Sequence, residues 1–155
     1  MKMLCATAFF AVIIPFSTTA GGRHCLFRIH AEANPNDTAV FALSVPAKFF
    51  GKEVSIEKVP RITEGDVVAF YPYPAANGTF GVLFQLDEHG TTALEALSIE
   101  LRGSLLFVLI NGRPVTELLV DKRVSDGRIY IASGLTKRDI DSMKKDWRLI
   151  GQRKR

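Results

Sequence analysis

The stretch INGRPVTELLVDKRVSDGRIYIASGLT, residues 110–136, decides the fold. It contains two turn dipeptides, Asn111-Gly112 and Asp126-Gly127, which separate runs of apolar residues. Asn, Asp and Gly tolerate the positive φ angles that a two-residue β-hairpin requires, and such a turn sets the register of both strands. The pattern predicts a three-stranded antiparallel meander over residues 105–110, 115–120 and 128–132.

An amphipathic helix is predicted on each side of this meander in the sequence. The first covers residues 92–101, where Thr92 and Glu95 form a capping-box pair. The second begins at Thr136, whose capping partner is Asp139. In both helices, apolar residues recur every three or four positions and form one face. These residues are Leu94, Leu97 and Leu101 in the first helix and Ile140, Met143 and Trp147 in the second.

The order of elements predicts an α+β fold. A strand is predicted at residues 80–86, before the first helix. The predicted order of elements over residues 80–150 is therefore strand, helix, three-stranded meander and helix. Both helices need an apolar surface, and one face of an antiparallel sheet supplies it. An extra N-terminal β-hairpin region is predicted before this domain, because strand formers at 25–29 and 39–45 flank the turn cluster 34–37.

Two further strands are predicted at residues 53–59 and 66–71. The segment YPYPAANG, residues 71–78, follows them. Proline fixes its own φ and cannot join a central ladder, so this segment is predicted to be an ordered surface loop.

The first 20 residues have the pattern of a secretory signal peptide. Lys2 supplies a positive start, residues 4–16 are apolar, and small residues follow up to Ala20. About 13 residues of helix reach only ~20 Å, short of the ~30 Å hydrocarbon core. The protein is therefore expected to be exported, to the periplasm or the extracellular space. Cleavage after Gly21 and an uncleaved anchor remain alternatives.

This division gives four segments along the chain. They are a signal peptide at 1–20, an N-terminal β-rich region at 21–79, an α+β domain at 80–150 and a basic tail at 151–155. Cys5 lies in the signal peptide, so Cys25 would be the one thiol of the mature chain and no internal disulfide could form. Its neighbours favour a buried, inert thiol.

The basic residues gather near the C-terminus, and weak association with a membrane surface through this end is one possibility. The alternative is a solvated end to a helix whose C-terminal dipole favours cations. The bases are Lys144, Lys145, Arg148, Arg153, Lys154 and Arg155. They are not interleaved with aromatic residues, so no nucleic-acid partner is expected.

No catalytic, cofactor-binding or metal-binding residue is predicted. A nucleophile needs a base and an orienting acid, and the histidines are only His24, His30 and His89. His89 follows Asp87 just before a predicted helix, where carboxylates act as N-terminal caps. A metal site of His24, Cys25 and His30 would lack a fourth ligand. As a minor alternative, cleavage after Gly21 would make Gly22 the first residue of the mature chain, and Gly22-Arg23-His24 could then chelate Cu(II) or Ni(II).

Residues 80–150 resemble the periplasmic head of the first large loop of SecD, an accessory subunit of the bacterial protein translocase. The likeness rests on LDEHG at 86–90, the Asn111-Gly112 turn, SDGRIYIASGLT at 125–136 and the helix that follows. It implies a head that contacts emerging preprotein and changes orientation, without catalytic residues of its own. The expectation is a lone head behind an export signal, with a different N-terminal half.

These observations predict an exported, non-catalytic binding or accessory module. Its expected partner is a protein or peptide, engaged through a sheet edge or the groove beside the helices. An envelope-associated structural protein and a small hydrolase with an unassigned site are the alternatives. The oligomeric state cannot be read from the pattern.

Overall fold

The computed structural model describes residues 22–34, 36, 40–47 and 51–152. The predicted signal peptide, residues 1–20, and the last three bases of the tail, residues 153–155, lie outside the described residues. So do Pro35 and Asp37 of the predicted 34–37 turn.

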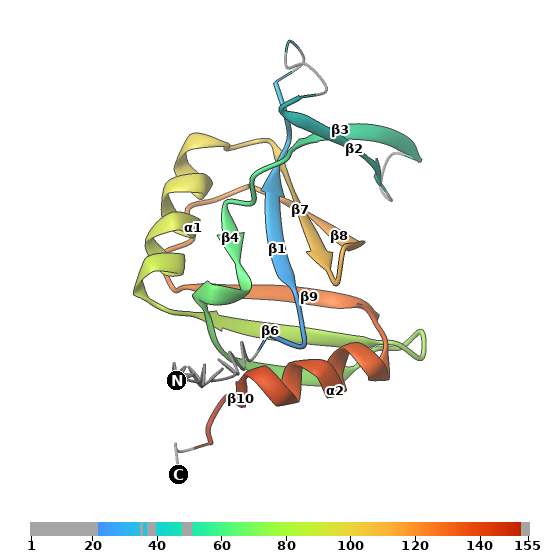
Figure 1. The fold of residues 1–155 in the computed structure, drawn as a ribbon. Helices are drawn as coiled ribbons and strands as arrows, with labels where there is room; N and C mark the ends of the chain where they lie inside the picture. Colours follow the sequence, from blue (N-terminus) through green and yellow to red (C-terminus); the bar gives the residue numbers. More distant parts are fainter. Residues whose placement is uncertain (1–21, 35, 37–39, 48–50, 153–155) are drawn as a thin grey trace, which may run out of the picture.

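The described chain forms two four-stranded sheets and one two-stranded hairpin, with two α-helices (Figure 1). The first sheet has the order β4-β1-β7-β8, the second sheet β10-β5-β6-β9, and the hairpin β2-β3. The predicted α+β class is confirmed. The elements are β1 (Phe27–Ala31), β2 (Ala42–Ala47), β3 (Lys52–Glu57), β4 (Ile62–Thr63), the 3₁₀ turn η1 (Glu64–Asp66), β5 (Val67–Pro74), β6 (Phe80–Leu86), α1 (Glu88–Glu100), β7 (Leu105–Ile110), β8 (Arg113–Leu119), β9 (Arg128–Leu135), α2 (Lys137–Asp146) and β10 (Arg148–Leu149).

The Asn111-Gly112 turn forms as predicted. Asn111 has a φ of 52° and Gly112 a φ of 77°, and Ile110 pairs with Arg113 across the turn. Asn111 also accepts a hydrogen bond from the Leu26 amide through its side-chain oxygen, at 2.9 Å. The turn therefore fixes the β7–β8 register and joins this hairpin to the residues that precede β1.

The predicted meander is wrong in its last strand. β9 does not pair with β8 but with β6, in the second sheet, where Val82 lies opposite Ile131. Gly127 has the positive φ of a turn, 64°, but its carbonyl accepts the Leu86 amide at 2.8 Å rather than closing a hairpin. The alternation of apolar residues in β9 indicates which face is buried, and it does not indicate which strand lies alongside.

The N-terminal region also pairs differently from the prediction. β1 runs between β4 and β7 in the first sheet, and the hairpin of this region is β2–β3. The predicted loop at 71–78 is partly strand, since β5 continues to Pro74 opposite Phe80. β10 pairs with β5 only at Ala69 and Phe70, so the prolines of β5 occupy an edge, where a missing amide is tolerated.

The two helices begin at side-chain caps. α2 has the predicted capping box of Thr136 and Asp139. α1 begins four residues earlier than predicted, because the Asp87 carboxylate accepts the Gly90 amide at 2.8 Å and acts as the N-cap. Thr92 instead donates its hydroxyl to the Glu88 carbonyl within the helix, at 2.9 Å.

Both helices and the first sheet cover the same face of the second sheet. Along β6 the alternate residues Val82, Phe84 and Leu86 are buried. The Phe84 ring lies 4.5 Å from that of Phe27 in β1 and 5.9 Å from that of Trp147, which caps α2. Apolar side chains of α1 and α2 belong to the same buried cluster. Figure 1 shows the strands of the two sheets crossing steeply, as in an orthogonal packing.

Strands from both sides of residue 79 share the two large sheets. β5 pairs with β6, and β1 pairs with β7 over five residues. The β2–β3 hairpin covers the other face of the first sheet, where Val45, Ala47 and Ile56 form a small cluster with Phe107. No helix within the described residues has the length and apolar character needed to cross a bilayer.

We predict that Asn111→Ala lowers the free energy of unfolding by about 1–3 kcal/mol. Alanine is strained at a φ of 52° and cannot accept the Leu26 amide. Asn111→Gly removes the hydrogen bond but tolerates the backbone, so it is expected to cost less, about 1 kcal/mol. Denaturant unfolding of the two variants measures the difference, and equal costs would contradict this account of the turn.

Candidate functional site

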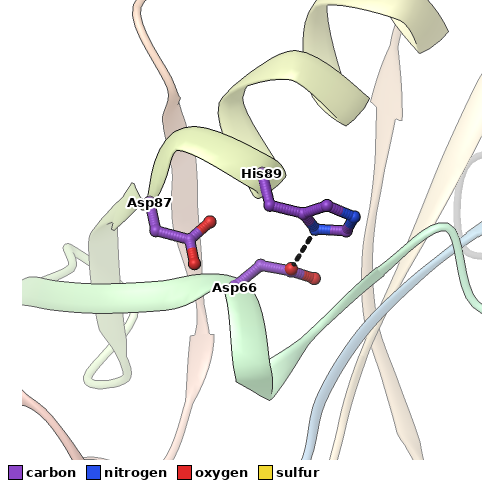
Figure 2. A group of neighbouring side chains, drawn as sticks. All are labelled: Asp66, Asp87 and His89. Atoms are coloured by element: carbon purple, nitrogen blue, oxygen red, sulfur yellow. Dashed lines mark hydrogen bonds and ion pairs between the residues drawn. The ribbon is translucent and has the colours of Figure 1, made fainter.

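Among the described residues, one group of side chains could hold a metal ion: Asp66, Asp87 and His89 (Figure 2). One potential ligand atom from each lies within 4.8 Å of the other two. Asp87 is the N-cap of α1 and His89 lies in its first turn, whereas the sequence placed both just before the helix. Asp66 comes from η1. Asp66 was missed because it is 21 residues from Asp87 in sequence and only the fold brings them together.

The carboxylates of this group already accept hydrogen bonds from the protein. Asp66 accepts the Thr63 amide at 2.7 Å with one oxygen and the His89 ring at 2.7 Å with the other. Asp87 caps α1 through Gly90, and its own amide donates to the Asp66 carbonyl at 2.8 Å. A Cβ at Gly90 would lie 2.7 Å from Asp66 Cβ, so glycine permits the close approach. The group therefore acts as a clamp between η1 and α1.

The electrostatics of the clamp are those of an ion pair at the surface. Burial opposes ionisation of Asp66, but the hydrogen bonds from Thr63 and His89 outweigh it and lower the pKa of this carboxyl. The hydrogen bond to Asp66 raises the pKa of His89 above its ordinary value. A metal ion would have to displace the His89 hydrogen bond and compete with both caps, although two carboxylates and an imidazole are suitable zinc ligands.

The other histidines and the cysteine lie outside the clamp; His24 and the Cys25 amide both bond to Asp146, and His30 has a different partner. His24 lies 2.9 Å from Asp146 through Nδ1, whereas His30 is buried and its Nδ1 lies 2.7 Å from the Glu57 carbonyl. Cys25 is buried as predicted, and burial raises the pKa of its thiol to about 12. A thiol with so high a pKa is a poor nucleophile. These three residues do not form a common site.

A different feature lies where β8 and β9 run beside each other at the edges of the two sheets. In the described part of the chain, β8 pairs only with β7, and β9 only with β6. The strands come close at one end, where a Cβ on Gly134 would lie 3.4 Å from Val115 Cγ1. Arg113 bridges this end, since it donates to the Gly134 carbonyl at 3.3 Å and to Asp139 at 2.8 Å. We call this region, residues 113–119 and 128–135, the β8–β9 seam.

Two pockets open along the seam. The one toward the open end has a volume of about 110 Å³ and is mainly apolar, with Leu94 of α1 beside Leu118 and Ile129. Leu119 and Tyr130 stand at its rim and are 63% and 59% exposed. The second pocket, about 370 Å³, lies toward Gly134 and is more polar. The sequence could indicate each apolar strand but not the space between two strands of different sheets.

An ordered aromatic pair borders the seam on the outer face of the second sheet. Tyr130 stacks on Tyr73 with ring centroids 5.4 Å apart and an interplanar angle of 10°. The Tyr73 hydroxyl donates to the Ile131 carbonyl at 2.5 Å, so the ring reaches from β5 across β6 to β9. Gly81 allows this crossing, because a Cβ there would overlap the Tyr73 ring. Tyr130 is therefore held in place while half of it stays exposed.

Comparison with solved structures shows a shared fold with SecDF. One match, "Crystal structure of SecDF in Super-membrane-facing form", has a TM-score of 0.56 and 14% identity, and covers 83% of this chain and 20% of that chain. Another, from "Structure and function of a membrane component SecDF that enhances protein export", has a TM-score of 0.57 and 13% identity, and covers 86% of this chain and 70% of that chain. No family model and no curated protein matches the sequence.

The structural likeness bears out the resemblance to SecD at the level of fold. It also extends the resemblance, which the sequence restricted to residues 80–150. Because more than four fifths of this chain is covered, the N-terminal part shares the fold as well, and the expectation of a different N-terminal half was wrong. The chain spans about a fifth of the first SecDF chain.

The His89–Asp66 pair gives a prediction for pH. His89 has a raised pKa, so its contribution to folding is complete below about pH 6.5 and is lost as the pH rises through the folded pKa. Asp66 has a lowered pKa, so its contribution is present above about pH 3.8 and is lost as the pH falls through the folded pKa. The clamp is thus strongest between these limits.

We expect an NMR titration to place the pKa of His89 above 6.5, and Asp66→Asn to return it toward that value. Asp87→Asn is the matched control, since asparagine also caps helices and Asp87 makes only a minor contribution to the shift. A His89 pKa that does not respond to Asp66→Asn would contradict the clamp.

Proposed function

We propose that this protein is an exported, non-catalytic accessory module that binds extended polypeptide at the β8–β9 seam. The observation that carries the proposal is the edge of β9 that faces β8, which pairs with no strand in the described structure and borders an apolar pocket. The shared fold with SecDF, a membrane component described as enhancing protein export, supports an accessory role in the same kind of process.

The chemistry of a strand edge favours an extended chain as the ligand. Edge strands present unpaired amide and carbonyl groups, and a bound peptide satisfies them with its own backbone. Such binding gives affinity without a defined sequence, because every residue carries the same backbone groups. Side chains of the bound strand alternate, so every second one would point toward the pocket beside Leu118 and Ile129.

The rim of the pocket suits a peptide that contains apolar residues. Leu119 of β8 and Tyr130 of β9 both line it and are exposed, and tyrosine supplies apolar area at a low cost in conformational entropy. Lys122 and Arg128 also line the pocket, and neither forms an ion pair within the described residues. An apolar segment followed by an acidic residue would fit this arrangement best.

We expect the double variant Leu119→Asp/Tyr130→Ala to weaken binding of a fluorescently labelled, permanently unfolded polypeptide about tenfold or more, measured by anisotropy. Both residues are exposed, so the fold should be retained. Ile99→Asp is the matched control, since Ile99 is 59% exposed on α1 and lies outside the pocket. Equal loss in the two variants would indicate non-specific adhesion and contradict the proposal.

The mode of binding can be tested with a peptide ligand methylated at backbone nitrogens. Methylation of alternate residues in one register should abolish strand addition, whereas methylation in the other register should leave binding nearly unchanged. If both registers bind equally well, the peptide does not pair with β9 and the seam is not a strand-addition site.

A further inference from the structure

The exposed face of α2 is strongly basic. Lys137, Arg138, Lys144 and Lys145 lie on it with a single acid, Asp141. At 3.6 residues per turn these positions cover about a third of the helix circumference. The opposite face carries Ile140 and Met143, which are buried in the core. We call these four bases the α2 basic face.

The stability of the helix does not explain this arrangement. A helix dipole favours cations in the last turn, which accounts for Lys144 and Lys145, but it disfavours them in the first turn, where Arg138 lies. Ion pairing is also slight: Lys137 lies 3.8 Å from Asp141, and within the described residues the other three bases form no ion pair. The charge on this face is therefore largely unneutralised.

Both ends of the described chain leave the molecule beside the C-terminal end of α2 (Figure 1). The amides of His24 and Cys25 donate to Asp146 at 2.6 and 2.7 Å, which fixes the N-terminal end there. Arg148 of β10 is exposed just after the helix, and Arg153, Lys154 and Arg155 follow in the sequence. Arg148 thus adds positive charge just beyond the C-terminal end of α2.

We propose that the α2 basic face docks on an anionic lipid surface. An array of exposed ammonium and guanidinium groups matches the negative surface of phospholipid headgroups. The apolar side of α2 packs in the core, so the helix cannot insert into the bilayer and attraction must be electrostatic. Binding should therefore need anionic lipid and decline steeply with salt, because screening shortens the Debye length to about 10 Å at 0.1 M. This surface is separate from the β8–β9 seam.

The test is flotation of the full chain with vesicles of phosphatidylcholine containing phosphatidylglycerol, and with vesicles of phosphatidylcholine alone. Lys144→Glu/Lys145→Glu should reduce partitioning onto the anionic vesicles about tenfold or more. Lys52→Glu/Lys58→Glu is the matched control: it makes the same change in net charge at exposed residues of the β2–β3 region, and it should bind nearly as well as the native chain. Circular dichroism checks that all variants fold.

Several outcomes would overturn the proposal. Equal loss in the two charge variants would indicate an effect of net charge alone. Loss only on neutralising Arg153, Lys154 and Arg155 would place the interaction in the tail rather than on α2. Partitioning onto neutral vesicles that neither variant changes would show that residues 1–21 carry all the binding. Binding to polyglutamate without binding to anionic vesicles would identify an acidic protein surface as the partner.

Discussion

The contact of Phe84 with Phe27 and Trp147 is the packing interaction on which the rest of the structure depends. These three aromatic rings come from the second sheet, the first sheet and the end of α2, and they bring these three parts of the molecule into one core. Aromatic rings bury large areas and prefer tilted or edge-on contacts of this kind. When these rings hold the two sheets face to face, each sheet keeps its own edge strands. β8 and β9 are such edge strands, and they lie next to each other without pairing through backbone hydrogen bonds.

The connection between β8 and β9 keeps the seam open at one end. Residues 120–127 do not form a tight turn; the Val120 carbonyl accepts the Gly103 amide, and the Val124 amide donates to Ser98 of α1. The Arg123 side chain pairs with Glu95 of the same helix. The connection is thereby held on α1, and several of its residues line the apolar pocket of the seam. At the opposite end of the seam, Arg113 bridges to Gly134 and Asp139.

Turns and helix caps could be predicted from the sequence, but the pairing of strands could not. The Asn111-Gly112 turn and the Thr136 cap depend on residues within four positions of each other, and both form as predicted. The pairing of β9 with β6 and of β1 with β7 depends on packing across the whole chain, which an alternating pattern does not specify. For the same reason Asp66 could not be placed beside His89, and the seam could not be foreseen.

The most direct test is amide hydrogen exchange of β9, measured with and without an unfolded polypeptide. Strand addition at the β9 edge predicts that in the free chain the amides of β9 that do not pair with β6 exchange rapidly, and that they become protected when the polypeptide binds, while the β6 amides stay unchanged. Rapid exchange that persists in the complex, or protection of every β9 amide in the free chain, would contradict it.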